Sequence, residues 1–189
     1  MCWSPTGEVP LSSIPQLKLL YREAESKVVR LDRFLALLAG NLSQYLSVDG
    51  IPPPALVEHI AVAKVKAVEQ SIDLCFRLKQ EVGSYALMAG TGFEKMDFLQ
   101  CCKFAEGDSR ILMQKLTRDR LKRFAKHPPK AGAAPGADAA ELELCTTLGM
   151  AMSSGDPAVA WDDSFVTVYA LAEAVMSRTM DELVPASKF

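Results

Sequence analysis

Residues 14–45 read IPQLKLLYREAESKVVRLDRFLALLAGNLSQY and predict one long helix. Charged residues such as Lys18, Arg22 and Glu25 lie between apolar residues that recur at alternating spacings of three and four. The pattern predicts a helix of roughly nine turns. The glycine and prolines of residues 49–54, DGIPPP, should end it because they cannot continue a helix. One continuous apolar seam should pack along neighbouring helices, through Ile14, Leu17, Tyr21, Ala24, Val28, Leu31, Leu35, Leu38, Leu42 and Tyr45.

Further helices are expected before residue 127. The second, over residues 54–82, carries small and apolar residues on two faces, which is typical of an inner helix with neighbours on both sides. Three glycines in residues 83–92 should then interrupt the helical path. A short helix is expected over residues 93–103, and a helix opened by Asp108 should run to about residue 125.

The C-terminal third begins with a segment that favours neither helix nor sheet. Residues 127–137 read HPPKAGAAPGA, the composition of a flexible linker. Helices are expected over residues 139–153 and 157–184, the second opened by the pair Asp156-Pro157. The apolar face of that last helix must be buried, either against the first helices or against a partner.

These patterns predict an all-α fold without a competing β pattern. We expect an antiparallel helical bundle over residues 1–126, a linker over residues 127–138 and a two-helix C-terminal extension over residues 139–189.

Charge and composition exclude several classes of function. The formal net charge is −2 and 49% of the residues are hydrophobic, as in an ordinary globular protein. The basic residues of 118–130 lie at one helix end, where they complement the helix dipole, so no nucleic-acid partner is expected. His59 and His127 have no partners at ligand spacing, so no metal site is expected.

The cysteines indicate a reducing intracellular compartment. There are five of them, an odd number, without the spacing of a disulfide framework or a zinc site.

No apolar stretch is long enough to predict a membrane span. The C-terminal Ser187-Lys188-Phe189 differs in one residue from a peroxisomal address, so a peroxisomal location is expected, with a mitochondrial one as the alternative.

One candidate for chemistry precedes the helix opened by Asp108. Glu106 could be held at the mouth of a helix packed into an apolar bundle, where a desolvated carboxylate becomes a usable base. The local sequence by itself favours the alternative, in which Glu106 is a solvated residue ahead of the helix and Asp108 is an ordinary N-cap. If Glu106 is the base, it should face an internal, water-poor crevice beside the glycine turn at residues 80–84.

The order of these features resembles the C-terminal helical domain of the acyl-CoA dehydrogenase and acyl-CoA oxidase superfamily. The resemblance extends from Pro10 to about Arg123. It rests on the long helix, the proline-rich loop, the Ala61-Val62-Ala63-Lys64 element, the turn at Gln80-Glu81-Val82-Gly83-Ser84 and the pair Glu106-Gly107.

The resemblance implies an FAD contact at the turn. Gln80, Gly83 and Ser84 stand where the family has Gln-x-x-Gly-Gly, a turn that approaches the flavin, often that of a neighbouring subunit. A small residue there lets backbone amides approach a pyrophosphate. Ser84 replaces the second glycine, so Gly83 could instead simply terminate the helix.

The resemblance also implies the reaction. Glu106 matches the family's catalytic base, which removes the α-proton of an acyl-CoA thioester while a hydride passes from the β-carbon to FAD. Gly107 would lie against the thioester. Asp108, expected on the cofactor side, replaces the usual threonine, as in the oxidase branch.

The domains that carry most of the flavin site in this family have no counterpart in the sequence. We therefore expect part of a flavin-dependent acyl-CoA dehydrogenase or oxidase that needs other domains or chains, as a homo-oligomer or with a complementary subunit. The alternative is a non-catalytic structural or assembly subunit derived from the family.

Overall fold

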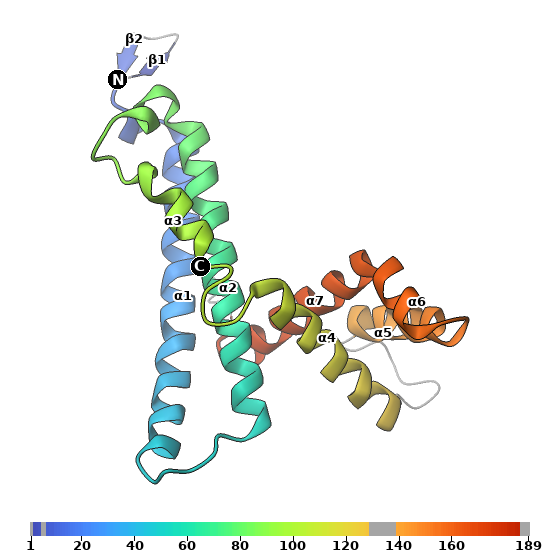
Figure 1. Cartoon of the computed structure of the whole chain (residues 1–189). Helices are drawn as coiled ribbons and strands as arrows, with labels where there is room; N and C mark the ends of the chain where they lie inside the picture. Colours follow the sequence, from blue (N-terminus) through green and yellow to red (C-terminus); the bar gives the residue numbers. More distant parts are fainter. Residues whose placement is uncertain (1, 5–6, 129–138, 186–189) are drawn as a thin grey trace.

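The protein is almost entirely helical. A computed structural model describes residues 2–4, 7–128 and 139–185, and this part contains seven α-helices (Figure 1). The strands form one small antiparallel hairpin, β1 (Cys2–Ser4) with β2 (Gly7–Val9), which the sequence patterns did not predict. The 3₁₀ turn η1 (Leu11–Ser13) follows. The predicted all-α class is confirmed.

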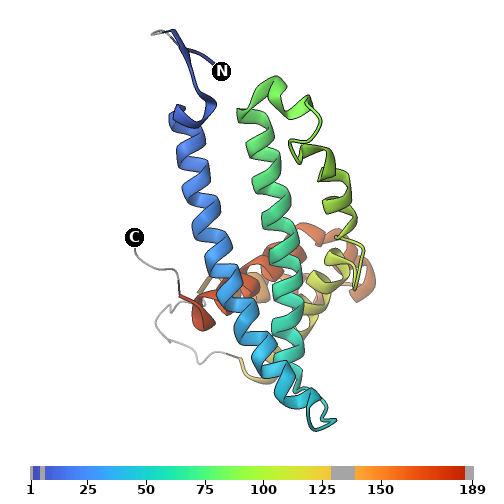
Figure 2. The same ribbon diagram turned by 90° about the vertical axis from the view of Figure 1, so that its left-hand side faces the viewer.

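The framework is a long antiparallel hairpin of two helices, α1 (Pro15–Leu46) and α2 (Pro54–Glu81) (Figure 2). Both helices match their predicted ranges within two residues. The connection turns sharply because Asp49 adopts a positive φ of 53° and the Gly50 amide donates to the carbonyl oxygen of Tyr45 at 2.8 Å. The proline-rich segment after this turn starts α2.

The buried stripe of α1 is narrower than predicted. Tyr21, Val28 and Leu35, which belong to the predicted seam, are exposed. The residues of α1 that are fully buried are Leu17, Leu20, Phe34 and Leu38. The prediction of one buried seam was wrong at these three positions, because α2 is the main neighbour of α1 and a helix packed on one side buries only a narrow stripe.

Helix α2 is the inner helix that its sequence predicts. Between Ala61 and Lys66, every residue except the half-buried Lys64 is buried. The main core cluster joins α2 to the other helices, through Phe34 and Leu38 of α1, Leu116 of α4, and Ala172 and Met176 of α7 among others.

Short elements connect α2 to the next long helix. They are η2 (Gly83–Leu87), η3 (Phe93–Lys95) and α3 (Met96–Cys101), which lies against α2, and they are followed by α4 (Ser109–Lys126). A loop of residues 102–108 separates α3 from α4. It lies roughly halfway along α2 (Figure 1).

The C-terminal extension has three helices in place of the predicted two. They are α5 (Ala139–Ser153), α6 (Pro157–Asp163) and α7 (Phe165–Leu183). The single helix predicted over residues 157–184 is broken at Ser164. Asp and Ser have low intrinsic helix propensity, so the sequence Asp162-Asp163-Ser164 suits a helix boundary better than an interior, although the Ser164 side chain makes no capping hydrogen bond.

The extension packs back onto the first helices. Buried residues of α7 enter the main core cluster, and others form a second cluster with Cys145 and Leu148 of α5. This packing decides between the two possibilities for the apolar face of the last helix. Two further polar contacts hold the extension in place, Arg30 Nε to the carbonyl oxygen of Val184 at 2.9 Å and the ion pair of Lys66 with Glu173.

A buried carboxylate links three helices of this region. Glu141 of α5 is only 3% exposed, and it accepts hydrogen bonds from Arg120 Nε of α4 at 2.7 Å and from Arg178 Nε of α7 at 2.5 Å. Glu141 is the shared counter-charge of both arginines, and Arg178 also pairs with the exposed Glu182, so the position of α5 depends on this buried acceptor.

We predict that Glu141→Gln destabilises the fold by about 3 kcal/mol, because two partly buried guanidinium groups would lose their shared counter-charge. The measurement is the free energy of unfolding from urea denaturation. The matched control is Glu182→Gln, which removes an exposed partner of the same Arg178 and should change stability by less than about 1 kcal/mol. Equal losses in the two variants would contradict the structural role of Glu141.

Candidate functional site

The loop between α3 and α4 presents the predicted base in an unusual backbone conformation. Glu106 has a φ of +53° and Gly107 a φ of +101°. A positive φ is uncommon for a residue with a β-carbon and stores strain of about 1–2 kcal/mol. Asp108 then caps α4, accepting from the amides of Arg110 at 2.7 Å and Ile111 at 3.2 Å. The N-cap interpretation of Asp108 is confirmed.

Both ends of this loop are fastened to α2 by Lys64. The Lys64 ammonium donates to the carbonyl oxygen of Lys103 at 2.8 Å and to Ser109 Oγ at 2.9 Å. The loop also closes on itself, because the Ser109 amide donates to the same Lys103 carbonyl at 2.8 Å. Lys103 Nζ in turn contacts Glu69 Oε2 at 3.0 Å. The strained residue is therefore held in a defined loop.

The sequence patterns did not predict that Lys64 anchors this loop. Lys64 entered the sequence analysis only as part of the element Ala61-Val62-Ala63-Lys64. The available signal was its position, because Lys64 is a charged residue within the otherwise mostly apolar run of 60–68, IAVAKVKAV. A charged residue on an inner helix usually has a buried or half-buried partner.

The structure does not bury Glu106. Its side chain is exposed in the described part of the chain, so the expectation of an internal, water-poor crevice was wrong. The reason is geometric: Lys64 of α2 holds the loop from one side, while residues 104–107 are exposed among the described residues. Phe104 and Ile111, which flank Glu106 in sequence, are also exposed, at 72% and 60%.

The glycine turn does not lie beside Glu106 either. Gly83, with a φ of +59°, directly follows the C-terminal end of α2, and Gln80 and Ser84 are exposed there. Sixteen residues of helix separate Gln80 from Lys64, which is about 24 Å along the axis. The expected neighbourhood of the two motifs was wrong, because a straight α2 keeps them apart.

The conformation of Gly83 explains why it is glycine. Among the residues that the structure describes, a β-carbon at this position would meet nothing within 4 Å, so none of them requires glycine there by close approach. Its left-handed backbone just after the last turn of α2 is the usual helix-terminating arrangement. Gln80, Gly83 and Ser84 do not enclose a cofactor by themselves.

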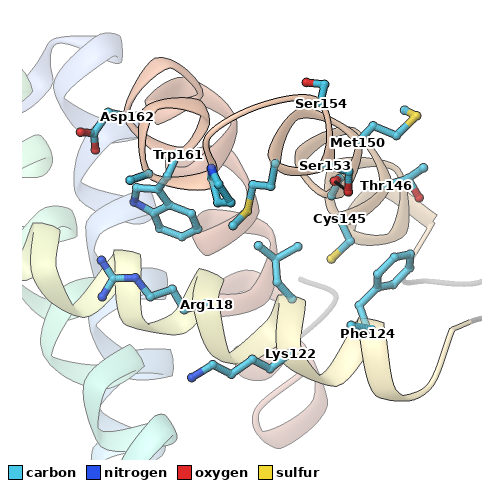
Figure 3. Close-up of a pocket in the computed structure, with 16 residues that line it drawn as sticks. Arg118, Lys122, Phe124, Cys145, Thr146, Met150, Ser153, Ser154, Trp161 and Asp162 are labelled. Carbon is cyan, nitrogen blue, oxygen red and sulfur yellow. Dashed lines mark hydrogen bonds between the residues drawn. The ribbon is translucent and has the colours of Figure 1, made fainter.

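A second candidate site, which the sequence patterns did not predict, lies in the C-terminal half. A pocket of about 1170 Å³ is formed by α4, α5 and α6, and Trp161 and Phe124 line it from opposite ends (Figure 3). Trp161 lies in the segment 157–184, whose apolar face the sequence analysis expected to be buried.

The described residues also bear on the metal, membrane and targeting expectations. Within the described residues, no three His, Cys, Asp or Glu side chains are grouped so that they could hold a metal ion. No helix in this part of the chain has the length and apolar character needed to cross a membrane. Most of the predicted linker, residues 129–138, and Ser187-Lys188-Phe189 lie outside the described residues.

Comparisons with protein-family models, with curated proteins and with solved structures find no match to this chain.

We predict that Glu106→Gly stabilises the protein by about 1 kcal/mol, because glycine adopts a positive φ without the steric penalty of a β-carbon. The measurement is again the free energy of unfolding. Glu106→Ala is the control, since alanine removes the carboxylate but keeps the strain, and it should leave stability nearly unchanged. A destabilised Glu106→Gly variant would show that the carboxylate itself supports the fold.

We predict that Lys64→Met increases hydrogen exchange at the amides of residues 103–109 by at least about tenfold, a loss of about 1.4 kcal/mol of local protection. The variant removes a donor to a loop carbonyl and leaves the buried Ser109 hydroxyl without its ammonium partner. Lys115→Met, which removes an exposed i,i+4 pair on α4, is the control and should leave the loop unchanged. Unchanged exchange in Lys64→Met would refute the anchoring role.

Proposed function

We propose that this chain is the helical part of a flavin-dependent acyl-CoA dehydrogenase or oxidase, completed by another domain or chain. The observation that carries the proposal is the loop at 103–109, in which a strained Glu106 is presented by an anchored structure. Strained residues held in place by their surroundings concentrate at functional sites. The resemblance in sequence supplies the chemistry.

The role of Glu106 is to accept the α-proton of the acyl-CoA thioester. An exposed carboxylate is a weak base, so the second component has to exclude water from Glu106 when it binds. The exposed Phe104 and Ile111 offer an apolar rim for that contact. Gly107 would then lie against the thioester, since its lack of a side chain leaves room for the substrate.

FAD would be held mainly by the second component. In this chain alone Gln80, Gly83 and Ser84 form no enclosure, and their distance from Glu106 fits contact with the flavin of a neighbouring subunit, as the resemblance implies. Asp108 already uses its Oδ1 to cap α4, so a cofactor contact there would fall to its other oxygen.

Helix α1 supports a composite assembly. Tyr21, Val28 and Leu35 are exposed at a spacing of seven residues, which places them on one side of the helix. An apolar stripe of this kind on a bundle helix is typical of a surface covered in the assembled protein.

The second candidate function is a non-catalytic structural or assembly subunit derived from the same family. The exposure of Glu106 and the helix-terminating role of Gly83 favour it, because neither residue then needs a ligand.

The test uses the assembly isolated from native cells through an affinity tag on this chain. We expect the assembly to show the visible absorption bands of oxidised flavin. Butanoyl-CoA, octanoyl-CoA and palmitoyl-CoA are the probes, and at least one should bleach the flavin band under anaerobic conditions. Glu106→Gln should reduce the rate of bleaching by about 10²–10⁴-fold while flavin content stays unchanged, because it removes the base.

The control is Asp49→Asn, which changes another exposed carboxylate at positive φ and should leave bleaching unchanged. Exchange of the α-proton with deuterated water, followed by NMR, separates proton removal from flavin reduction. A flavin-free assembly would favour the structural subunit, and full activity of Glu106→Gln would refute the assigned role of this residue.

A further inference from the structure

The pocket between α4, α5 and α6 has a floor made of the hydrophobic core. Its lining includes the buried Cys145 and four half-buried residues, Leu121, Phe124, Met152 and Trp161, which pack against the second core cluster. In Figure 3 the sulfur of Cys145 points into the space between Phe124 and Trp161. A solvent-accessible hollow with such a floor exposes apolar surface that a ligand can cover.

The side chains that form the floor of the pocket carry no charge. Burial raises the pKa of the Cys145 thiol above its ordinary value, so the thiol stays protonated near neutral pH. The apolar neighbours of this thiol suit a hydrocarbon or aromatic body.

The charged groups at the rim are mainly positive. Arg118 and Lys122 lie one turn apart on α4, and the Arg118 guanidinium stacks over the Trp161 ring at 5.1 Å from its centre. Lys122 makes no ion pair within the described residues. Asp162 is the acidic residue of the lining, and in Figure 3 its carboxylate is turned away from Lys122.

We propose that this pocket binds an amphipathic anion with a single charged head, of which a medium- or long-chain carboxylate is the simplest. The chain would cover the floor between Phe124 and Trp161, and the carboxylate would lie near Lys122 and Arg118. Apolar lining with a few polar groups on one side is the usual composition of a small-molecule site. This proposal does not rest on the proposed dehydrogenase function.

A substitution at Gly149 can fill the pocket while every core residue stays unchanged. This glycine lies within α5 and lines the pocket, and a β-carbon added to it would meet nothing within 4 Å. Gly149→Leu should therefore fold, with a higher helix propensity, and place its side chain in the hollow. Gly40→Leu is the matched control, because Gly40 is also a helical glycine with open space around it, on α1.

The experiment titrates the full chain with dodecanoate below its micelle concentration and follows heat by calorimetry. In a Trp3→Phe background, Trp161 is the remaining tryptophan, so a saturable change in its emission places the ligand in the pocket. Gly149→Leu should weaken binding at least tenfold and Gly40→Leu should not change it. Lys122→Gln should weaken dodecanoate several-fold but leave dodecanol unchanged.

Three outcomes would overturn the proposal. The first is no saturable binding of dodecanoate, and the second is equal affinity in wild type and Gly149→Leu. The third is sedimentation with vesicles of phosphatidylglycerol without binding of monomeric dodecanoate, which would assign the positive rim to an anionic lipid surface.

Discussion

The fold depends on the burial of α2 between Ala61 and Lys66. This segment is covered by α1, α4 and α7 together, and the core cluster that it forms draws residues from all four helices. A helix covered on several sides can gain more from apolar burial than a surface helix, at about 25 cal/mol for each Å² removed from water. α4 and α7 contact α2, and α1 forms a hairpin with it.

The same segment of α2 also positions the candidate catalytic loop. Lys64 lies among buried apolar neighbours, yet its ammonium reaches the loop that carries Glu106. Core packing and loop geometry are therefore coupled through one side chain: a shift or rotation of α2 would move the anchor of the loop. The strain at Glu106 is maintained because Lys64, the Ser109 amide and the Asp108 cap all constrain the chain around it. Such coupling is expected for a loop whose backbone conformation matters for function.

The C-terminal extension contributes to the core and adds a site of its own. α7 fills one side of the main cluster, while residues of α4, α5 and α6 line the pocket with Trp161 at one end. Glu141 and its two arginines link α5 to α4 and to α7. A polar network thus positions the helix that lines an apolar hollow.

The sequence by itself determined the local structure of this protein. Apolar patterns placed α1 and α2, and the caps Asp108 and Asp156 defined the starts of α4 and α6, because these signals depend on side chains within one or two turns. The inner position of α2 was also readable, since two apolar faces need two neighbours. The break at Ser164 was missed, because a helix end without a glycine or proline has only weak local signals.

Only the tertiary structure decided what each helix contacts. The exposure of Tyr21, Val28 and Leu35, the open side of Glu106, and the separation of Glu106 from Gly83 all follow from which helices lie next to each other. The Lys64 contacts also follow from this packing, since they join residues that are 39 and 45 positions apart in the sequence. The pocket at Trp161 does so too, because its lining comes from three different helices. Sequence patterns report which faces are apolar, but the partner of each face is set by the packing of the whole chain.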